Sequence, residues 1–217
     1  MKLLLFLLFV LSFASCTSDQ KPAESPVIAQ ADSLIVDTLT ESKKDNNILN
    51  VFHCDIKPMI PGGYELLDST TGDLNLDEYR DCILVLKNKN EETDTTGESN
   101  KRLMMLVLGK ADGTCVVKEK SFNIIWPLGA GGGFREAYTD VVIAKGAFMV
   151  EHQGGNHNRY TLYTYFNYDS LKDTWYLEET KSIGIDINDL EAGEEVYRET
   201  VKDFGSVKFE DYKSFGE

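Results

Sequence analysis

The chain has 217 residues, of which 36 are acidic and 22 are basic, so its formal net charge is −14. An apolar fraction of 42% is typical of a globular protein and excludes wholesale disorder. The acidic balance excludes a nucleic-acid partner, because such binding needs a patch of basic side chains that neutralises phosphates. It also argues against docking on anionic lipid through basic residues.

The N-terminus has the order of a secretory signal peptide. Lys2 precedes an unbroken apolar run over residues 3–11, and small residues then stand before Cys16. The apolar segment falls short of the roughly 20 residues that a membrane-spanning helix needs. Ala14-Ser15-Cys16 resembles the lipobox of bacterial lipoproteins. This resemblance implies cleavage after residue 15 and lipid attachment to Cys16. An ordinary signal peptide with an incidental cysteine is the alternative.

The next segment has the composition of a tether. Residues 17–48 contain no aromatic side chain and two of the five prolines. Such a segment cannot bury enough apolar surface to offset its ordering entropy. We therefore expect a signal peptide (1–15), a flexible tether (16–48) and a single mostly β domain (49–217). We expect this protein to be lipid-anchored in a bacterial cell envelope, at the outer membrane or the periplasmic face.

Three cysteines remain once Cys16 is set aside: Cys54, Cys82 and Cys115. In an oxidising compartment an odd count allows at most one internal disulfide and leaves one spare thiol. The spacing does not select the pair, and three buried reduced thiols are the alternative. The sequence contains no Cys-x-x-Cys pair, so nothing supports a thioredoxin-like redox function.

The remaining residues alternate short apolar runs with polar turns, a pattern typical of strands. Asp112-Gly113 and Lys145-Gly146 predict hairpin turns. The polar insert 87–101 predicts a mobile loop. Large rings on both faces of residues 159–168 predict a central strand with cover on each side. The expected strands are 81–86, 102–109, 114–118, 140–144, 147–151, 159–168 and 174–180.

One helix is expected near the end of the chain. Asp186 or Asn188 would cap it, and Gly205 would end it. The apolar residues that recur there at helical spacing are Leu190, Tyr197, Val201 and Phe204. The expected fold class is therefore mainly β (α+β), with antiparallel meander sheets and one C-terminal helix.

One segment, Gly72 to Asp81, carries oxygen side chains at alternating positions. Loop positions one, three, five and nine are Asp73, Asn75, Asp77 and Asp81. Calcium takes about six to eight oxygen ligands, and alternation in a tight loop turns such groups inward.

This loop differs from known calcium loops at two positions. Leu84 stands where an EF-hand has its bidentate glutamate, so the loop is not an EF-hand. Glu78 stands at position six, where calcium loops usually have glycine. The alternative to calcium binding is an Asx-rich turn in which Asp73, Asn75 and Asp77 cap their own backbone.

The segment and the apolar strand after it resemble the pattern G-D-L-N-x-D-x-x-x-D of the calcium-loop repeats called FG-GAP or VCBS. Those repeats occur in extracellular and periplasmic proteins, so the resemblance implies calcium as a cofactor. Residues 60–180 also resemble a family of uncharacterised bacterial exported proteins, which implies no known activity. The features that carry this second resemblance are Arg102-Leu103, Asp112-Gly113, Gly129 to Gly133 and His152-Gln153-Gly154-Gly155.

Three further patterns have both a functional and a packing interpretation. Glu151, His152 and His157 suggest a zinc or acid–base site, although no third metal ligand is visible beside the two histidines. The glycines 129–133 lack the Lys-Ser or Lys-Thr of a phosphate loop, so close backbone packing is favoured. The tyrosine-rich stretch 160–168 suggests a carbohydrate or peptide platform, but cross-strand packing is favoured.

Together these patterns predict a binding or interaction module with a structural calcium ion and a protein or glycan partner. The alternative is an envelope hydrolase that uses Glu151, His152 and His157. A purely structural lipoprotein is a third hypothesis.

Overall fold

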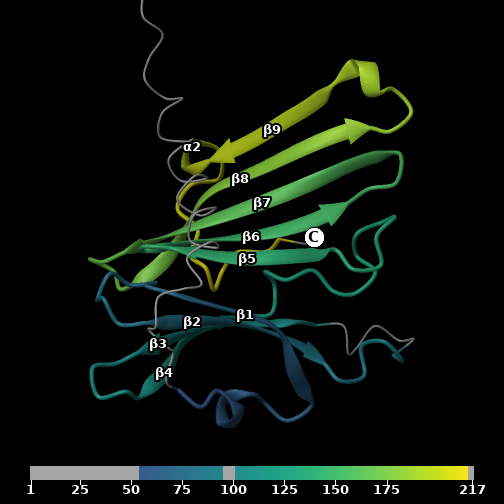
Figure 1. The fold of residues 1–217 in the computed structure, drawn as a ribbon. Helices are drawn as coiled ribbons and strands as arrows, with labels where there is room; N and C mark the ends of the chain where they lie inside the picture. The colour runs from purple at the N-terminus through teal and green to yellow at the C-terminus, as the bar shows by residue number, and fades with distance from the viewer. Residues whose placement is uncertain (1–53, 95–100, 215–217) are drawn as a thin grey trace, which may run out of the picture.

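The computed structural model describes residues 54–94 and 101–214, and these residues form two antiparallel sheets (Figure 1). The predicted signal peptide and the whole predicted tether, which includes Cys16, lie outside the described residues. Within the described part, no helix is long and apolar enough to cross a membrane. The predicted fold class, mainly β with antiparallel meander sheets and one C-terminal helix, is confirmed.

The first sheet is a meander in the order β1-β2-β3-β4. Its strands are β1 (Tyr64–Gly72), β2 (Asp81–Asn88), β3 (Leu103–Gly109) and β4 (Cys115–Ser121). β3 and the middle of β2, residues 82–86, are apolar and buried on both faces, because each face has its own cover. One face packs on the second sheet, and the other packs under the segment that contains the 3₁₀ turn η1 (Lys57–Met59).

The second sheet is a longer meander in the order β5-β6-β7-β8-β9. Its strands are β5 (Tyr138–Ala144), β6 (Ala147–Gly154), β7 (Asn158–Asp169), β8 (Thr174–Asp186) and β9 (Glu194–Thr200). The inner face contributes Phe148, Val150 and Phe166 to the core that both sheets share. The outer face has a small apolar cluster around Met149 and Tyr165.

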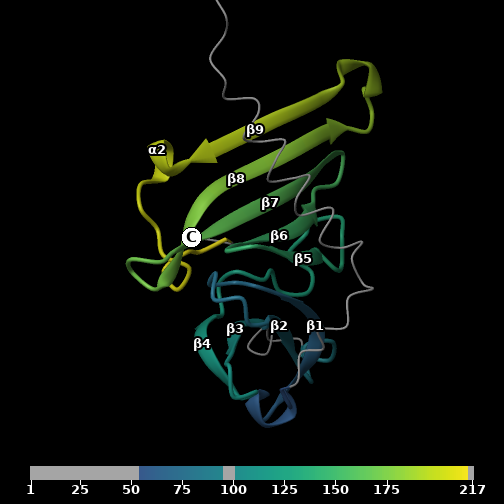
Figure 2. The same ribbon diagram turned by 60° about the vertical axis from the view of Figure 1, so that its left-hand side comes forward.

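The two sheets meet where β1 runs beside β5 (Figures 1 and 2). Gly72 permits this close approach, because a Cβ at this position would overlap the Ile143 side chain. A hydrogen bond of 2.8 Å from the Tyr138 hydroxyl to Asp68 also joins the two strands. After β9, the chain returns to the core, where Phe209 is fully buried against Phe148 and Phe166.

The central position of β7 was predicted correctly, and its faces divide as expected. The expected cover on each side was wrong: the inner face packs in the shared core, whereas the cluster on the outer face consists of side chains of the second sheet itself. Phe166 and Tyr168 pack in the shared core, whereas Tyr163 and Tyr165 lie on the outer face with ring centroids 6.5 Å apart. The hairpin turns at Asp112-Gly113 and Lys145-Gly146 are also confirmed. In the second hairpin Ala144 pairs directly with Ala147, and Gly146 has a φ of +72°.

The prediction of a late helix was wrong in its extent. Residues 190–192 form a 3₁₀ turn (η2, Leu190–Ala192), and residues 194–200 form strand β9 on the edge of β8 (Figure 2). Only α2 (Val201–Phe204) is helical; Thr200 and Asp203 cap its start, and Gly205 follows it as predicted. Gly193, with a φ of +79°, interrupts the helical spacing, and β8 supplies hydrogen-bond partners to the segment after it.

The first part of the polar insert 87–101 has defined contacts. Lys87 and Asn88 belong to β2, and the Glu91 side chain is buried against Arg102 at 2.9 Å. Residues 95–100 lie outside the described residues. A polar composition predicted a mobile loop here, whereas Arg102, the residue that follows the insert, holds Glu91 in the first half of the insert.

Cys54 and Cys115 form a disulfide, with Cα atoms 6.1 Å apart. The bond ties the beginning of the described chain to β4. Cys82 is a buried free thiol, and burial raises the pKa of this thiol to about 12. The thiolate is the reactive form, so Cys82 is inert in the folded protein.

Replacing both Cys54 and Cys115 by serine should lower the free energy of unfolding by about 2–4 kcal/mol, because the bond constrains the unfolded chain. Urea denaturation with and without a thiol reductant measures the effect. Reductant should bring the parent to the stability of the double variant and leave the variant unchanged. A parent that is indifferent to reductant would contradict the pairing.

Candidate metal centre

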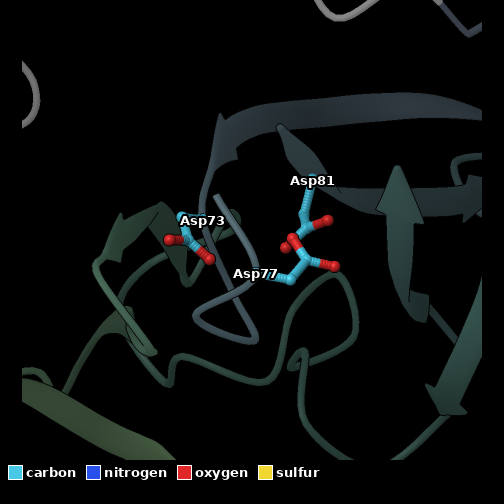
Figure 3. Close-up of side chains that lie close together, drawn as sticks. All are labelled: Asp73, Asp77 and Asp81. Atoms are coloured by element: carbon cyan, nitrogen blue, oxygen red, sulfur yellow. The ribbon is translucent and has the colours of Figure 1, made fainter. Parts of the chain in front are cut away.

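The loop between β1 and β2 brings three carboxylates together. Asp73, Asp77 and Asp81 each offer an oxygen, and these oxygens lie within 4.8 Å of one another (Figure 3). The loop closes on itself between the paired strand ends Gly72 and Asp81. The predicted positions one, five and nine therefore converge, as alternation in a tight loop requires.

Asn75 at position three takes part in the same network. Its amide nitrogen donates to Asp77 Oδ2 at 2.8 Å, and its oxygen accepts from the Asp77 N–H at 3.3 Å. Asp73 accepts the Leu76 N–H at 2.7 Å, and Asp77 accepts the Tyr79 N–H at 2.9 Å. These are the hydrogen bonds that the alternative hypothesis, an Asx-rich turn, predicts. They do not prevent metal binding, because each carboxylate oxygen retains a second lone pair.

Asp81 is the buried member of the cluster. Its two oxygens accept the Leu74 N–H at 2.7 Å and the Gly109 N–H at 2.9 Å, and the side chain is fully buried. Burial raises the pKa of Asp81 to about 6, against the lowering effect of these two hydrogen bonds; Asp77 and Asp73 raise it further. A positive charge in the loop would favour the ionised form of Asp81.

The loop also contacts the second sheet. Leu74 is fully buried in the shared core, and its carbonyl accepts a hydrogen bond of 3.0 Å from Trp175 Nε1 on β8. The Asp73 carbonyl accepts the Gly146 N–H of the β5–β6 turn at 2.8 Å. The loop is therefore a joint between the two sheets.

Two loop residues have left-handed backbone. Leu76 has a φ of +66° and Glu78 a φ of +69°. The left-handed region favours glycine, so Glu78 occupies a position that suits the glycine usual at position six of calcium loops. Position six therefore has the left-handed backbone that glycine favours, although its residue is Glu78.

The three residues of the hydrolase hypothesis do not converge. His152 is fully buried on the inner face of β6, where its ring stacks on Trp126 at 4.9 Å. Glu151, its neighbour in the strand, lies on the outer face, and His157 is exposed in the β6–β7 turn. The prediction that these three residues form one site was therefore wrong. Neighbouring residues of a strand point to opposite faces, and the core buries His152 alone.

His152 accepts the Trp126 N–H at Nε2, at 3.2 Å, so its proton is assigned to Nδ1. Nδ1 has no hydrogen-bond partner among the described residues. Burial, assisted by the positive charge of Arg102, lowers the pKa of His152 to about 3. The imidazole is neutral in the folded protein.

Sequence reasoning missed the ionic cluster around Arg102. The guanidinium is fully buried and binds Glu91 at 2.9 and 3.0 Å, and Glu136 at 2.6 and 2.7 Å. It also donates to the Trp126 carbonyl at 3.2 Å. A charged residue at the start of the apolar run 102–109 was the available signal. Arg102, immediately before β3, thus holds the loop that contains Glu91 and the loop that contains Glu136.

The two glycine-rich segments pack backbone against backbone, as favoured for residues 129–133. The Gly155 N–H donates to the Gly131 carbonyl at 3.0 Å, and the Gly133 N–H donates to the Gly155 carbonyl at 3.1 Å. A Cβ at Gly131 would approach the Gln153 carbonyl to 2.9 Å. The glycines allow this approach.

Acid should destabilise the protein through His152. In the unfolded chain histidine takes a proton as the pH falls below about 6.5, whereas folded His152 resists protonation until about pH 3. Its contribution to stability is therefore complete above about pH 6.5 and is lost as the pH falls through this window, by at most about 1.4 kcal/mol per pH unit.

The pH dependence of urea unfolding in parent, His152→Phe and His157→Gln proteins measures this contribution. His152→Phe should be less stable at pH 7, because Trp126 loses its acceptor, and should show a shallower loss of stability with acid. His157→Gln, which removes an exposed histidine, should retain the parental slope. Equal slopes in all three proteins would refute the assignment.

Comparison of the chain with protein-family models, with curated proteins and with solved structures finds no match. The resemblances to FG-GAP or VCBS loops and to exported bacterial proteins therefore remain predictions from the sequence.

Proposed function

We propose that this protein is a lipid-anchored binding module of a bacterial cell envelope, and that its loop Gly72 to Asp81 holds a structural calcium ion. The observation that carries the calcium proposal is the convergence of three carboxylates in a loop that contacts both sheets. The bound ion would order this loop and so stabilise the joint between the sheets.

The chemistry of the loop favours a hard cation. Carboxylate and amide oxygens are the side-chain ligands on offer, and calcium prefers such a set to the nitrogen and sulfur donors of zinc sites. Three carboxylates within 4.8 Å repel one another, and a divalent cation would offset this repulsion. The left-handed backbone at Glu78 also supports a calcium-loop geometry.

The location in the cell envelope rests on two observations. The sequence begins with an apolar run and small residues before Cys16. The Cys54–Cys115 disulfide independently favours an oxidising compartment. The acidic charge suits an anchor of acyl chains rather than basic residues.

The separation of Glu151, His152 and His157 favours a binding role over the hydrolase alternative. A general acid–base site needs its groups within hydrogen-bond reach of the reacting atoms. A neutral imidazole buried beneath Trp126 is placed for packing. Within the described residues, the outer face of the second sheet offers a surface for a partner.

Chelation tests the calcium site. Calcium at about 100 times its dissociation constant should raise the melting temperature of the chelated parent by about 5–10 °C. The Asp73→Asn, Asp77→Asn double variant keeps the acceptors for Leu76 and Tyr79 but removes two charges. Its melting temperature should not respond to calcium.

The matched control is Asp186→Asn, Asp189→Asn, which removes one charge from the end of β8 and one from the exposed turn that follows it. This variant should respond to calcium as the parent does. If the parent shows no shift and the purified protein contains no calcium, the ion site is refuted and the Asx-turn alternative holds.

Detergent phase partition tests the anchor. The full-length protein, expressed with its own N-terminus in a Gram-negative host, should enter the detergent phase, because several acyl chains give nearly permanent attachment. Cys16→Ser should move the protein to the aqueous phase, whereas Cys82→Ser should not. Detergent partition of the Cys16 variant would exclude lipid attachment at this residue.

A further inference from the structure

The outer face of the second sheet contains a hollow of about 300 Å³ at the start of β7 and the end of β8. It lies away from the Asp73 loop and has no part in the argument for calcium. Its sheet floor includes Gln153, Thr161, Ile183 and Ile185, and Phe134 of the glycine-rich loop forms one wall. Its size is at the lower end for small-ligand sites.

Strand register places two opposite charges in one row of this hollow. Arg159 on β7 pairs with Ile185 on β8, and Ile185 pairs with Glu194 on β9. Because neighbouring strands lie about 4.8 Å apart, the backbones of Arg159 and Glu194 are separated by about 10 Å. An apolar side chain lies between a cation and an anion.

The two charges do not neutralise each other. Arg159 lies over the Phe134 ring, 5.6 Å from its centroid, and within the described residues it forms no ion pair. Both Arg159 and Glu194 are exposed at the hollow. A guanidinium held on a ring presents its planar fork of donors to a carboxylate.

The aromatic rings at this site argue against a sugar. Arg159 covers a face of Phe134, and the Tyr160 ring lies on the opposite side of the sheet, edge-on to Trp126. Glu194 and the overall charge of −14 disfavour a phosphate ligand. An amide and a hydroxyl, from Gln153 and Thr161, suit the polar groups of a peptide.

We propose that this hollow binds short zwitterionic peptides of about two to three residues. Arg159 binds the terminal carboxylate, Glu194 binds the terminal ammonium, and Ile183 and Ile185 contact an apolar side chain. The inference deepens the proposed binding function by naming its site and ligand class.

Calorimetric titration with the tripeptide Ala-Leu-Ala tests the proposal. The free peptide should bind, and its N-acetylated, C-amidated form should bind at least about tenfold more weakly, because both charges are removed. Arg159→Met and Glu194→Gln should each weaken binding of the free peptide by at least about tenfold.

Two neighbouring residues provide matched controls. Arg135→Met removes an exposed arginine beside Phe134, and Glu195→Gln removes a carboxylate on the opposite face of β9. Both should bind the free peptide within about twofold of the parent. Equal losses in the controls, equal binding of free and blocked peptide, or no binding up to about 10 mM would overturn the proposal.

A parallel titration with maltohexaose distinguishes failure of the peptide site from failure of the proposed binding function. If the sugar binds and the tripeptide does not, the peptide site fails while the binding function stands. The calcium and partition experiments do not depend on this titration, so failure of the hollow leaves them intact.

Discussion

The joint between the two sheets depends on the loop that connects β1 to β2. Leu74 is buried in the core of both sheets; its N–H donates to Asp81, and its carbonyl accepts from Trp175. Asp81 also accepts from Gly109, so one carboxylate connects the loop to β3. Burial of a carboxylate costs free energy unless its oxygens are satisfied. The residues that hold the sheets together therefore also create the negative site that we propose for calcium.

The other buried polar groups position loops. Arg102 binds Glu91 before the undescribed residues 95–100 and Glu136 ahead of β5, while His152 accepts the Trp126 N–H. A buried charge is stable only when it is paired, so Arg102 with two carboxylates fixes both segments at once. The segment between Trp126 and Glu136 carries Phe134, which supports Arg159 at the hollow. The polar core thus shapes the surface on which we place ligand binding.

Features that depend on residues close together in the chain were predicted correctly, whereas features that depend on distant residues were not. The turns at Asp112-Gly113 and Lys145-Gly146 were predicted because turn chemistry acts within a few residues. Strands β1 and β9 were missed because their exposed faces lack a clear apolar alternation. The late helix was overextended because helical spacing competes with pairing to β8, which the sequence does not display. The loop carboxylates were predicted to converge because they lie in one short segment.

The sequence alone determined the mainly β meander, the Asp-rich loop and the signal-peptide pattern, since each depends on residues that are neighbours in the chain. Tertiary structure decided which cysteines pair, 61 residues apart, and which carboxylates neutralise Arg102. It also decided that Glu151 and His152 lie on opposite sides of a sheet with only one face on the core. These outcomes depend on the register and packing of strands that are distant in the chain. A local sequence pattern does not specify which distant surface packs against it.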